Sequence, residues 1–137
     1  MRRGLGLEDI MHKQFGGLMR QYEGYGKLNC AYWSYDASGE ARTKTTASLL
    51  KSKGLNGGKG DYFFIKQQKA LIIPGKNAID HFIWLEFKKP KTTTAKGKQS
   101  DSQKEFESKF KDSINSRYYL VYSVQEAIKI LEREGIL

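Results

Sequence analysis

Two carboxylates and an amine stand at the ends of apolar, strand-forming stretches of this sequence. Asp61 directly precedes the run 62–65, and Glu86 and Lys88 lie in and just after the run 83–87. Because successive side chains of a strand point to opposite faces, Glu86 and Lys88 share one face. Burying a carboxylate and an ammonium is costly unless they pair with each other or hold a cation. A metal site accounts for these charges.

The stretch around Glu86 is expected to be a central strand of a sheet. Phe82 and Trp84 share the face of Glu86, while Ile83 and Leu85 lie on the opposite face, so both faces begin apolar. Two apolar faces are typical of strands that are covered on each side in an α/β sheet.

The other elements follow from apolar periodicity and from turn-forming residues. In chain order we expect a helix over 7–22, a strand over 28–35, a basic helix over 40–53, strands over 62–65 and 83–87, a helix over 100–114, a strand over 118–123 and a final helix starting at Ser123. Residues 71–73 could form another short strand, and the polar run 91–99 is expected to be mobile. Gly16 and Gly17 either weaken the first helix or mark close packing against another element. This order predicts a single α/β domain over 1–137, with a mixed central sheet flanked by helices.

The composition favours a polyanionic partner. The chain has 24 Lys and Arg against 15 Asp and Glu, a net charge of +9, which suits nucleic acid or an anionic membrane surface. No apolar run is long enough to span a bilayer, and the N-terminus lacks an apolar signal core. We therefore expect nucleic acid rather than a membrane, and a cytoplasmic location. The single cysteine, Cys30, excludes an internal disulfide framework and a cysteine-based zinc site.

Four short motifs follow one another along the chain. They are an acid-bearing helix start (Glu8-Asp-Ile-Met-His12), a glycine-rich turn before an acid (Gly54-Leu-Asn-Gly-Gly58-Lys-Gly60-Asp61), a Glu-x-Lys element (Leu85-Glu86-Phe87-Lys88) and a Ser-x-x-Gln helix opening (Ser100-Asp-Ser-Gln103). In this order they resemble the VRR-NUC domain, a branch of the PD-(D/E)XK nuclease superfamily, over about residues 8–131. The resemblance implies a restriction-endonuclease-like core. The family usually has proline where this chain has Gly60, which we expect to leave the approach to Asp61 less rigid, and an Asn-Gly-type turn where this chain has Asp36-Ala-Ser-Gly39.

The resemblance also implies a ligand set for Mg²⁺, with Mn²⁺ as a possible substitute. Hard oxygen ligands suit Mg²⁺, which takes only one or two carboxylates and keeps several waters. Asp61 and Glu86 would supply the carboxylates, and the backbone carbonyl of Phe87 would add a third ligand. Glu8 would approach the same ion, or a second one, from the first helix.

Lys88 and Gln103 complete the catalytic residues that the resemblance implies. The ammonium of Lys88 would orient the attacking water or stabilise the developing negative charge. Gln103 would orient the water or Lys88, at a helix N-terminus that attracts phosphate. Each assignment has a structural alternative, which the sequence leaves open. Asp61 could end a turn, Glu86 and Lys88 could be an ion pair, Gln103 could belong to a capping box, and Glu8 could be a favourable charge in the first turn of a helix. His12, one turn beyond Glu8, is expected to be structural.

Lysines flank this candidate site in the sequence. We expect contacts with nucleic-acid phosphates from Lys44, Lys51, Lys59, Lys89, Lys91, Lys96 and Lys98. The alternative is an ordinary solvated surface.

These observations favour a Mg²⁺-dependent, structure-selective DNA endonuclease. Stand-alone members of the resembled family act on structured DNA, including four-way junctions, and some are homodimers, so junction resolution by a homodimer in a bacterial or phage-infected cell is the more specific expectation. The alternative is a non-catalytic, basic nucleic-acid-binding module on the same fold. An interaction protein with an aromatic docking surface is a weaker third possibility, because aromatic strands need no partner.

Overall fold

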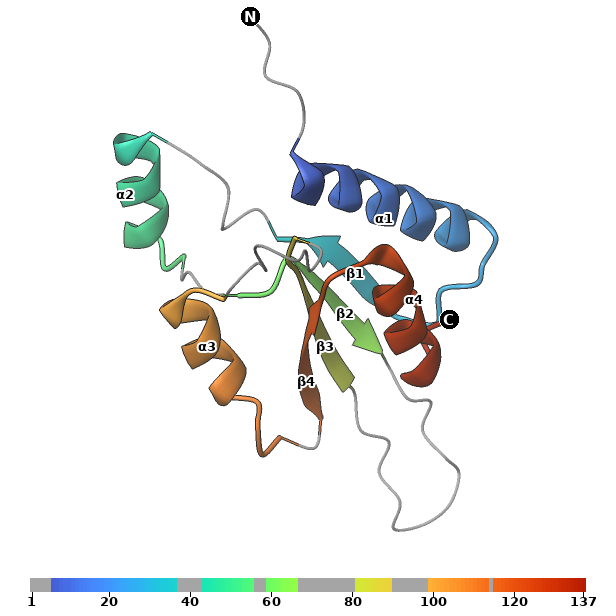
Figure 1. Cartoon of the computed structure of the whole chain (residues 1–137). Coiled ribbons are helices and arrows are strands. Elements are labelled where there is room, and N and C mark those ends of the chain that lie inside the picture. The colour runs from blue at the N-terminus through green and yellow to red at the C-terminus, as the bar shows by residue number, and fades with distance from the viewer. Residues whose placement is uncertain (1–5, 37–42, 56–58, 67–80, 90–98, 114) are drawn as a thin grey trace, which may run out of the picture.

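The chain folds into an α/β arrangement whose elements follow the predicted order. The computed structural model describes residues 6–36, 43–55, 59–66, 81–89, 99–113 and 115–137. Within these residues lie, in order, α1 (Leu7–Gly24), β1 (Tyr32–Tyr35), α2 (Lys44–Ser52), β2 (Tyr62–Lys66), β3 (His81–Phe87), α3 (Asp101–Ser108), β4 (Ser116–Val121) and α4 (Val124–Arg133) (Figure 1). None of the helices among these residues is both long and apolar enough to cross a membrane.

The four strands form one mixed sheet with the order β1-β2-β3-β4. β2 pairs antiparallel with both β1 and β3, whereas β3 and β4 run parallel. β3 is therefore an inner strand, as its two apolar faces predicted. Tyr62 pairs with Leu85, so Asp61, one residue earlier, stands beside the end of β3 that carries Glu86.

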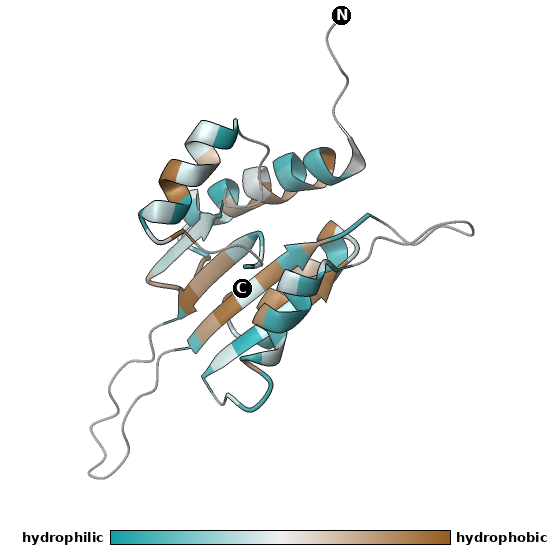
Figure 2. Cartoon of the chain, turned by 90° about the vertical axis from the view of Figure 1, so that its left-hand side faces the viewer, coloured by the Kyte–Doolittle hydropathy of each residue, from teal (hydrophilic) through white to brown (hydrophobic). Residues whose placement is uncertain are grey.

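One face of the sheet holds the core, under α1 and α4. Phe15 and Met19 of α1 are fully buried against alternate residues of β3, Ile83 and Leu85. The amphipathic helix α4 buries Val124, Ala127 and Leu131 in the same cluster. Figure 2 shows apolar residues concentrated along the inner strands.

The opposite face of the sheet is covered over only part of its length. The ring of Trp84 meets Phe106 of α3 edge-on, with centroids 5.2 Å apart, and Phe106 also contacts Tyr118 of β4. Phe82, two residues before Trp84 on the same face, remains 41% exposed. The prediction of two covered faces thus holds from Trp84 toward Glu86, which is the end of β3 where the candidate site lies.

Several boundaries differ from those predicted. β1 begins at Tyr32 rather than at 28, and the chain before it is held by single backbone hydrogen bonds such as that from Asn29 N–H to the carbonyl of Ile136. α3 ends at Ser108 rather than at 114, and Ser113 then accepts hydrogen bonds from the backbone of residues 115 and 116 in the turn that leads into β4. The strand considered at 71–73 and nearly all of the run 91–99 lie outside the described residues.

Candidate active site at the ends of β2 and β3

Asp61 is held at the edge of the sheet by its neighbours on both sides. Its Oδ2 accepts a hydrogen bond of 2.7 Å from the backbone N–H of Phe87, and its backbone carbonyl accepts one from Asp36 N–H at the end of β1. The buried Gly60 lies against β3, where a Cβ atom would sit 3.0 Å from the carbonyl oxygen of Leu85. The approach to Asp61 is therefore closely packed at Gly60, and the expectation that a glycine here leaves it less rigid than a proline would stays a prediction.

Glu86 is buried next to Lys88, as the strand alternation predicted. The carboxylate is only 1% exposed, and its Oε1 lies 3.5 Å from Lys88 Nζ. The other oxygen, Oε2, is buried without a hydrogen-bond partner in the structure as described. The predicted ion pair exists, but it satisfies one half of the carboxylate and leaves the other half bare.

Burial dominates the electrostatics of the two carboxyl groups. Burial raises the pKa of Glu86 to about 8 against the attraction of Lys88, and the negative charge of Asp61 adds to the rise. Burial also raises the pKa of Asp61, although its hydrogen bond from Phe87 and the charge of His12 oppose the rise. A bound cation would favour the ionised form of both groups.

The side chain of His12 lies next to that of Asp61. Its sequence context did not indicate this contact. Its Nε2 is 3.9 Å from Asp61 Oδ2, and its ring packs among those of Tyr35, Tyr62 and Phe87 at centroid distances of 5.4–5.5 Å. Its other nitrogen, Nδ1, is buried with no hydrogen-bond partner among the described residues. The aromatic packing fits the structural role expected for His12, but the contact with Asp61 also places it in the site.

Glu8 acts electrostatically on Asp61 without joining the two carboxyl groups in one ligand set. It occupies the first turn of α1, where a negative charge is favourable, and its charge contributes to the raised pKa of Asp61. Among the described residues, however, no three side chains of His, Cys, Asp or Glu lie close enough together to form a metal-binding group. Glu8 therefore does not complete a compact three-acid site with Asp61 and Glu86.

The remaining donors fit Mg²⁺ better than a metal that needs an all-protein cage. Two hard carboxylates are a sufficient protein contribution for Mg²⁺, which keeps its waters. The bare Oε2 of Glu86 is the oxygen at which a cation would relieve the cost of an unpaired buried carboxylate, a cost that protonation relieves in its absence. Phe87 provides its N–H to Asp61, and a role for its carbonyl stays a prediction.

Gln103 opens α3 as part of a capping box. Its Oε1 accepts a hydrogen bond of 2.8 Å from Ser100 N–H, while Ser100 Oγ accepts one from Gln103 N–H. The structural alternative for Gln103 is thus confirmed. With its oxygen bonded to the N-cap backbone, Gln103 has its amide N–H groups to offer to a phosphate.

The lysines that were expected to contact phosphates differ in their surroundings. Lys44 and Lys51 are exposed on α2, and Lys89 is exposed just after β3. Lys59 instead forms an ion pair of 3.1 Å with Asp36 and is largely buried, so it ties the end of β1 to the segment before β2. The other three, Lys91, Lys96 and Lys98, lie outside the described residues.

Comparisons with known proteins find no match for this chain among protein-family models, curated proteins or solved structures. The function is therefore inferred from the geometry and electrostatics of the site.

Proposed function

We propose that this protein is a Mg²⁺-dependent deoxyribonuclease with a restriction-endonuclease-like core. The observation that carries the proposal is the buried carboxylate of Glu86, with one bare oxygen and a pKa of about 8, beside Asp61 and Lys88. Such perturbed groups are typical of functional sites. The resemblance of the four sequence motifs to VRR-NUC nucleases supports the same function.

The residues of the site have distinct roles in this proposal. Asp61 and Glu86 hold the cation, which when bound polarises the phosphoryl oxygens and lowers the pKa of a bound water. The Phe87 N–H fixes the orientation of Asp61. Lys88, 3.5 Å from Glu86, would stabilise the negative charge that develops on the phosphate. His12 positions Asp61 from the side of α1.

The proposed substrate is structured DNA, such as flapped, splayed or four-way-junction DNA. The excess of nine positive charges and the exposed lysines on α2 and after β3 support a polyanionic partner. A homodimer that resolves four-way junctions is the most specific form of the proposal, since a twofold assembly would deliver two paired incisions.

A cleavage assay with matched controls tests the proposal. Linear, flapped, splayed and four-way DNA would be incubated with Mg²⁺ or Mn²⁺ and wild type, Asp61→Asn or Lys88→Met. Loss of a ligand or of charge stabilisation should lower the rate by about 100-fold or more. Asp112→Asn and Lys129→Met, which alter exposed residues after α3 and on α4, should cleave like wild type. Equal cleavage by all five proteins would refute the proposal.

One observation favours a non-catalytic DNA-binding module as the second candidate. With a pKa of about 8, Glu86 is mostly protonated at neutral pH, and a neutral carboxyl beside Lys88 needs no metal. A module of this kind would bind DNA in a salt-dependent manner, with an affinity that Mg²⁺ does not raise, and the same assay would show no products on any substrate.

A further inference from the structure

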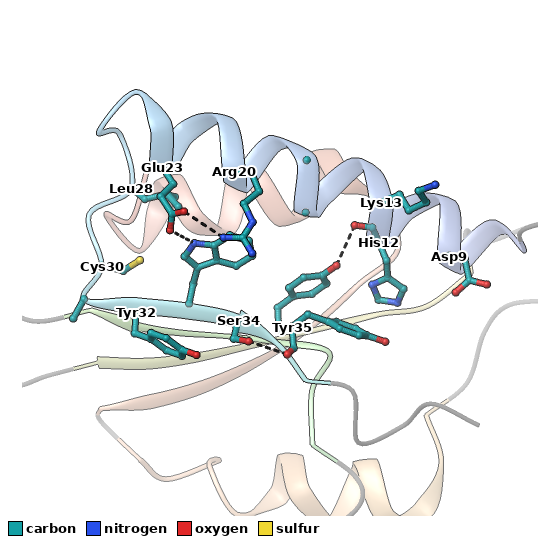
Figure 3. Close-up of a pocket in the computed structure, with 15 residues that line it drawn as sticks. Asp9, His12, Lys13, Arg20, Glu23, Leu28, Cys30, Tyr32, Ser34 and Tyr35 are labelled. Carbon is teal, nitrogen blue, oxygen red and sulfur yellow. Dashed lines mark hydrogen bonds and ion pairs between the residues drawn. The ribbon is translucent and has the colours of Figure 1, made fainter. Parts of the chain in front are cut away.

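A groove of about 810 Å³ lies between α1 and the edge strand β1. Figure 3 shows its lining: His12 and Tyr35 lie at one end, and Arg20 and Glu23 lie at the other. Both Arg20 and Glu23 contact the indole of Trp33 there. We call it the α1–β1 groove. None of the roles proposed for Asp61, Glu86 and Lys88 uses it.

Two adjacent glycines keep the α1–β1 groove open. Gly16 and Gly17 lie in the middle of α1, which continues unbroken through them. A Cβ atom on Gly17 would have no atom within 4 Å, and one on Gly16 would make only an ordinary contact of 3.9 Å with the Tyr62 hydroxyl. Neither close packing nor an unusual backbone angle therefore requires these glycines. Each lowers helix stability by about 1 kcal/mol relative to alanine. A ligand bound in the space beside them would account for glycine at these positions.

The walls of the groove present flat, π-rich surfaces together with two cations, Lys13 and Arg20, and two acids, Asp9 and Glu23. Trp33 is stacked on Phe64 on one side and lies 5.1 Å below the guanidinium of Arg20 on the other. Glu23 accepts hydrogen bonds from both Trp33 and Arg20, so the acid and the guanidinium form an exposed ion pair over the indole. The ring of Tyr35 is 37% exposed. Aromatic rings and arginine planes are the surfaces on which unpaired bases stack.

The groove adjoins the candidate active site through His12. This residue lines the groove and also lies 3.9 Å from Asp61, and Tyr62, which lines the groove too, donates a hydrogen bond to the His12 carbonyl. The acidic Asp9 and the basic Lys13 both lie at this end, and Arg20 lies farther along α1. A strand that leaves the site past His12 would run toward Arg20.

The size of the groove limits what can enter it. About 810 Å³ is the volume of a small-molecule site, which accommodates a base with its sugar but not a base-paired duplex.

We propose that the α1–β1 groove binds an unpaired DNA strand adjoining the bond to be cut. A base stacks against the Arg20 guanidinium or the Tyr35 ring, and the phosphates contact Lys13 and Arg20. The inference rests on the proposed nuclease function and names its substrate class: DNA in which a single strand leaves a duplex, such as a flap or a splayed arm.

The test uses a substitution that fills the groove and leaves the fold intact. Gly17→Leu places a side chain in the open space and should strengthen α1. Gly24→Leu is the matched control, because a Cβ there also meets nothing within 4 Å and Gly24 lies outside the groove. Arg20→Lys keeps the charge but removes the planar surface. Binding of a fluorescent 12-nucleotide single strand, and of the same sequence as a duplex, would be measured by anisotropy in EDTA, with free thymidine monophosphate as a competitor.

The proposal expects Gly17→Leu to weaken single-strand binding by at least tenfold, Arg20→Lys to weaken it several-fold, and Gly24→Leu to leave it unchanged. Duplex binding should change less than twofold in all three. Unchanged single-strand binding by Gly17→Leu, or an equal loss for single strand and duplex, would overturn the inference. Binding of thymidine monophosphate to the groove without binding of the single strand would also overturn it. Cleavage of flapped DNA by the same proteins is scored separately, so the absence of products would count against the nuclease function and not against the groove.

Discussion

Replacing Glu86 by glutamine should separate the stability of the fold from the function of the site. Burial, aided by the charge of Asp61 and opposed by Lys88, raises the pKa of Glu86 from 4.5 to about 8 in the folded protein. Between these two values the folded state binds a proton that the unfolded state has lost. Since stability falls with pH wherever the native state binds more protons, Glu86 destabilises the fold progressively from about pH 4.5 to about pH 8.

The size of the effect follows from the gap between the two pKa values. A rise from 4.5 to about 8 corresponds to a loss of about 5 kcal/mol once the group is ionised in both states. About 4 kcal/mol of this loss should occur between pH 5 and pH 9. Glutamine has the same size and no titrating proton. The free energy of unfolding of Glu86→Gln, relative to wild type, should therefore rise by about 4 kcal/mol over this range.

Urea unfolding at pH 5, 7 and 9 in the presence of a chelator would measure this difference. Trp84, two residues before Glu86 on the same strand, provides the fluorescence signal. Glu132→Gln is the matched control, because this residue is exposed on α4 and its change should give no such trend. Parallel pH dependences for wild type and Glu86→Gln would refute the buried-carboxyl interpretation.

The same variant tests whether the site holds a cation. A cation that binds the ionised carboxylate displaces its proton, so Mg²⁺ should stabilise wild type increasingly as the pH approaches 8, and cleavage should rise over the same range. Mg²⁺ should not stabilise Glu86→Gln to the same extent. Equal stabilisation of both proteins would place the cation elsewhere.

Three further predictions concern the surroundings of the site and the core. His12→Phe should keep the aromatic packing but lose the contact with Asp61, so cleavage should fall at least several-fold while the melting temperature stays within a few degrees. Gly60→Ala should lower the free energy of unfolding by about 1–3 kcal/mol in urea, because its Cβ would press on the backbone of β3, whereas Gly24→Ala should not. Glu134 is buried, yet hydrogen bonds from Tyr119 and Arg117 hold its pKa below the ordinary value. Its contribution is therefore present above about pH 4.5 and lost as the pH falls through the lower, folded-state pKa. Acidification from pH 6 to pH 3 should thus destabilise wild type more than Glu134→Gln, as measured by thermal unfolding.

Features determined by local sequence were predicted well. The alternation of side chains along β3 placed Trp84 and Glu86 on one face and Ile83 and Leu85 on the other, as the structure has them. The order of helices and strands was also correct, because each element carries its own periodicity or cap, such as the capping box at Ser100.

Features that depend on contacts between distant segments were not predictable in this way. His12 reaches Asp61 only because α1 packs across β2 and β3, and no local pattern contains that geometry. The pairing of Lys59 with Asp36 likewise depends on the antiparallel register of β1 and β2. The glycine pair in α1 indicated either a weak helix or close packing, but the helix is continuous and the space beside Gly17 is open.

The two buried glutamates differ in how their carboxyl groups are compensated. Glu134 is also buried, but Arg117 and Tyr119 donate hydrogen bonds to it, and its pKa is lowered. An acid that serves only the fold is compensated in this way. Glu86 has a cationic neighbour in Lys88, and yet its second oxygen is bare and its pKa rises to about 8. The chain thus compensates the buried carboxylate of Glu134 from within, whereas the second oxygen of Glu86 is left to a proton or, in the function that we propose, to a cation.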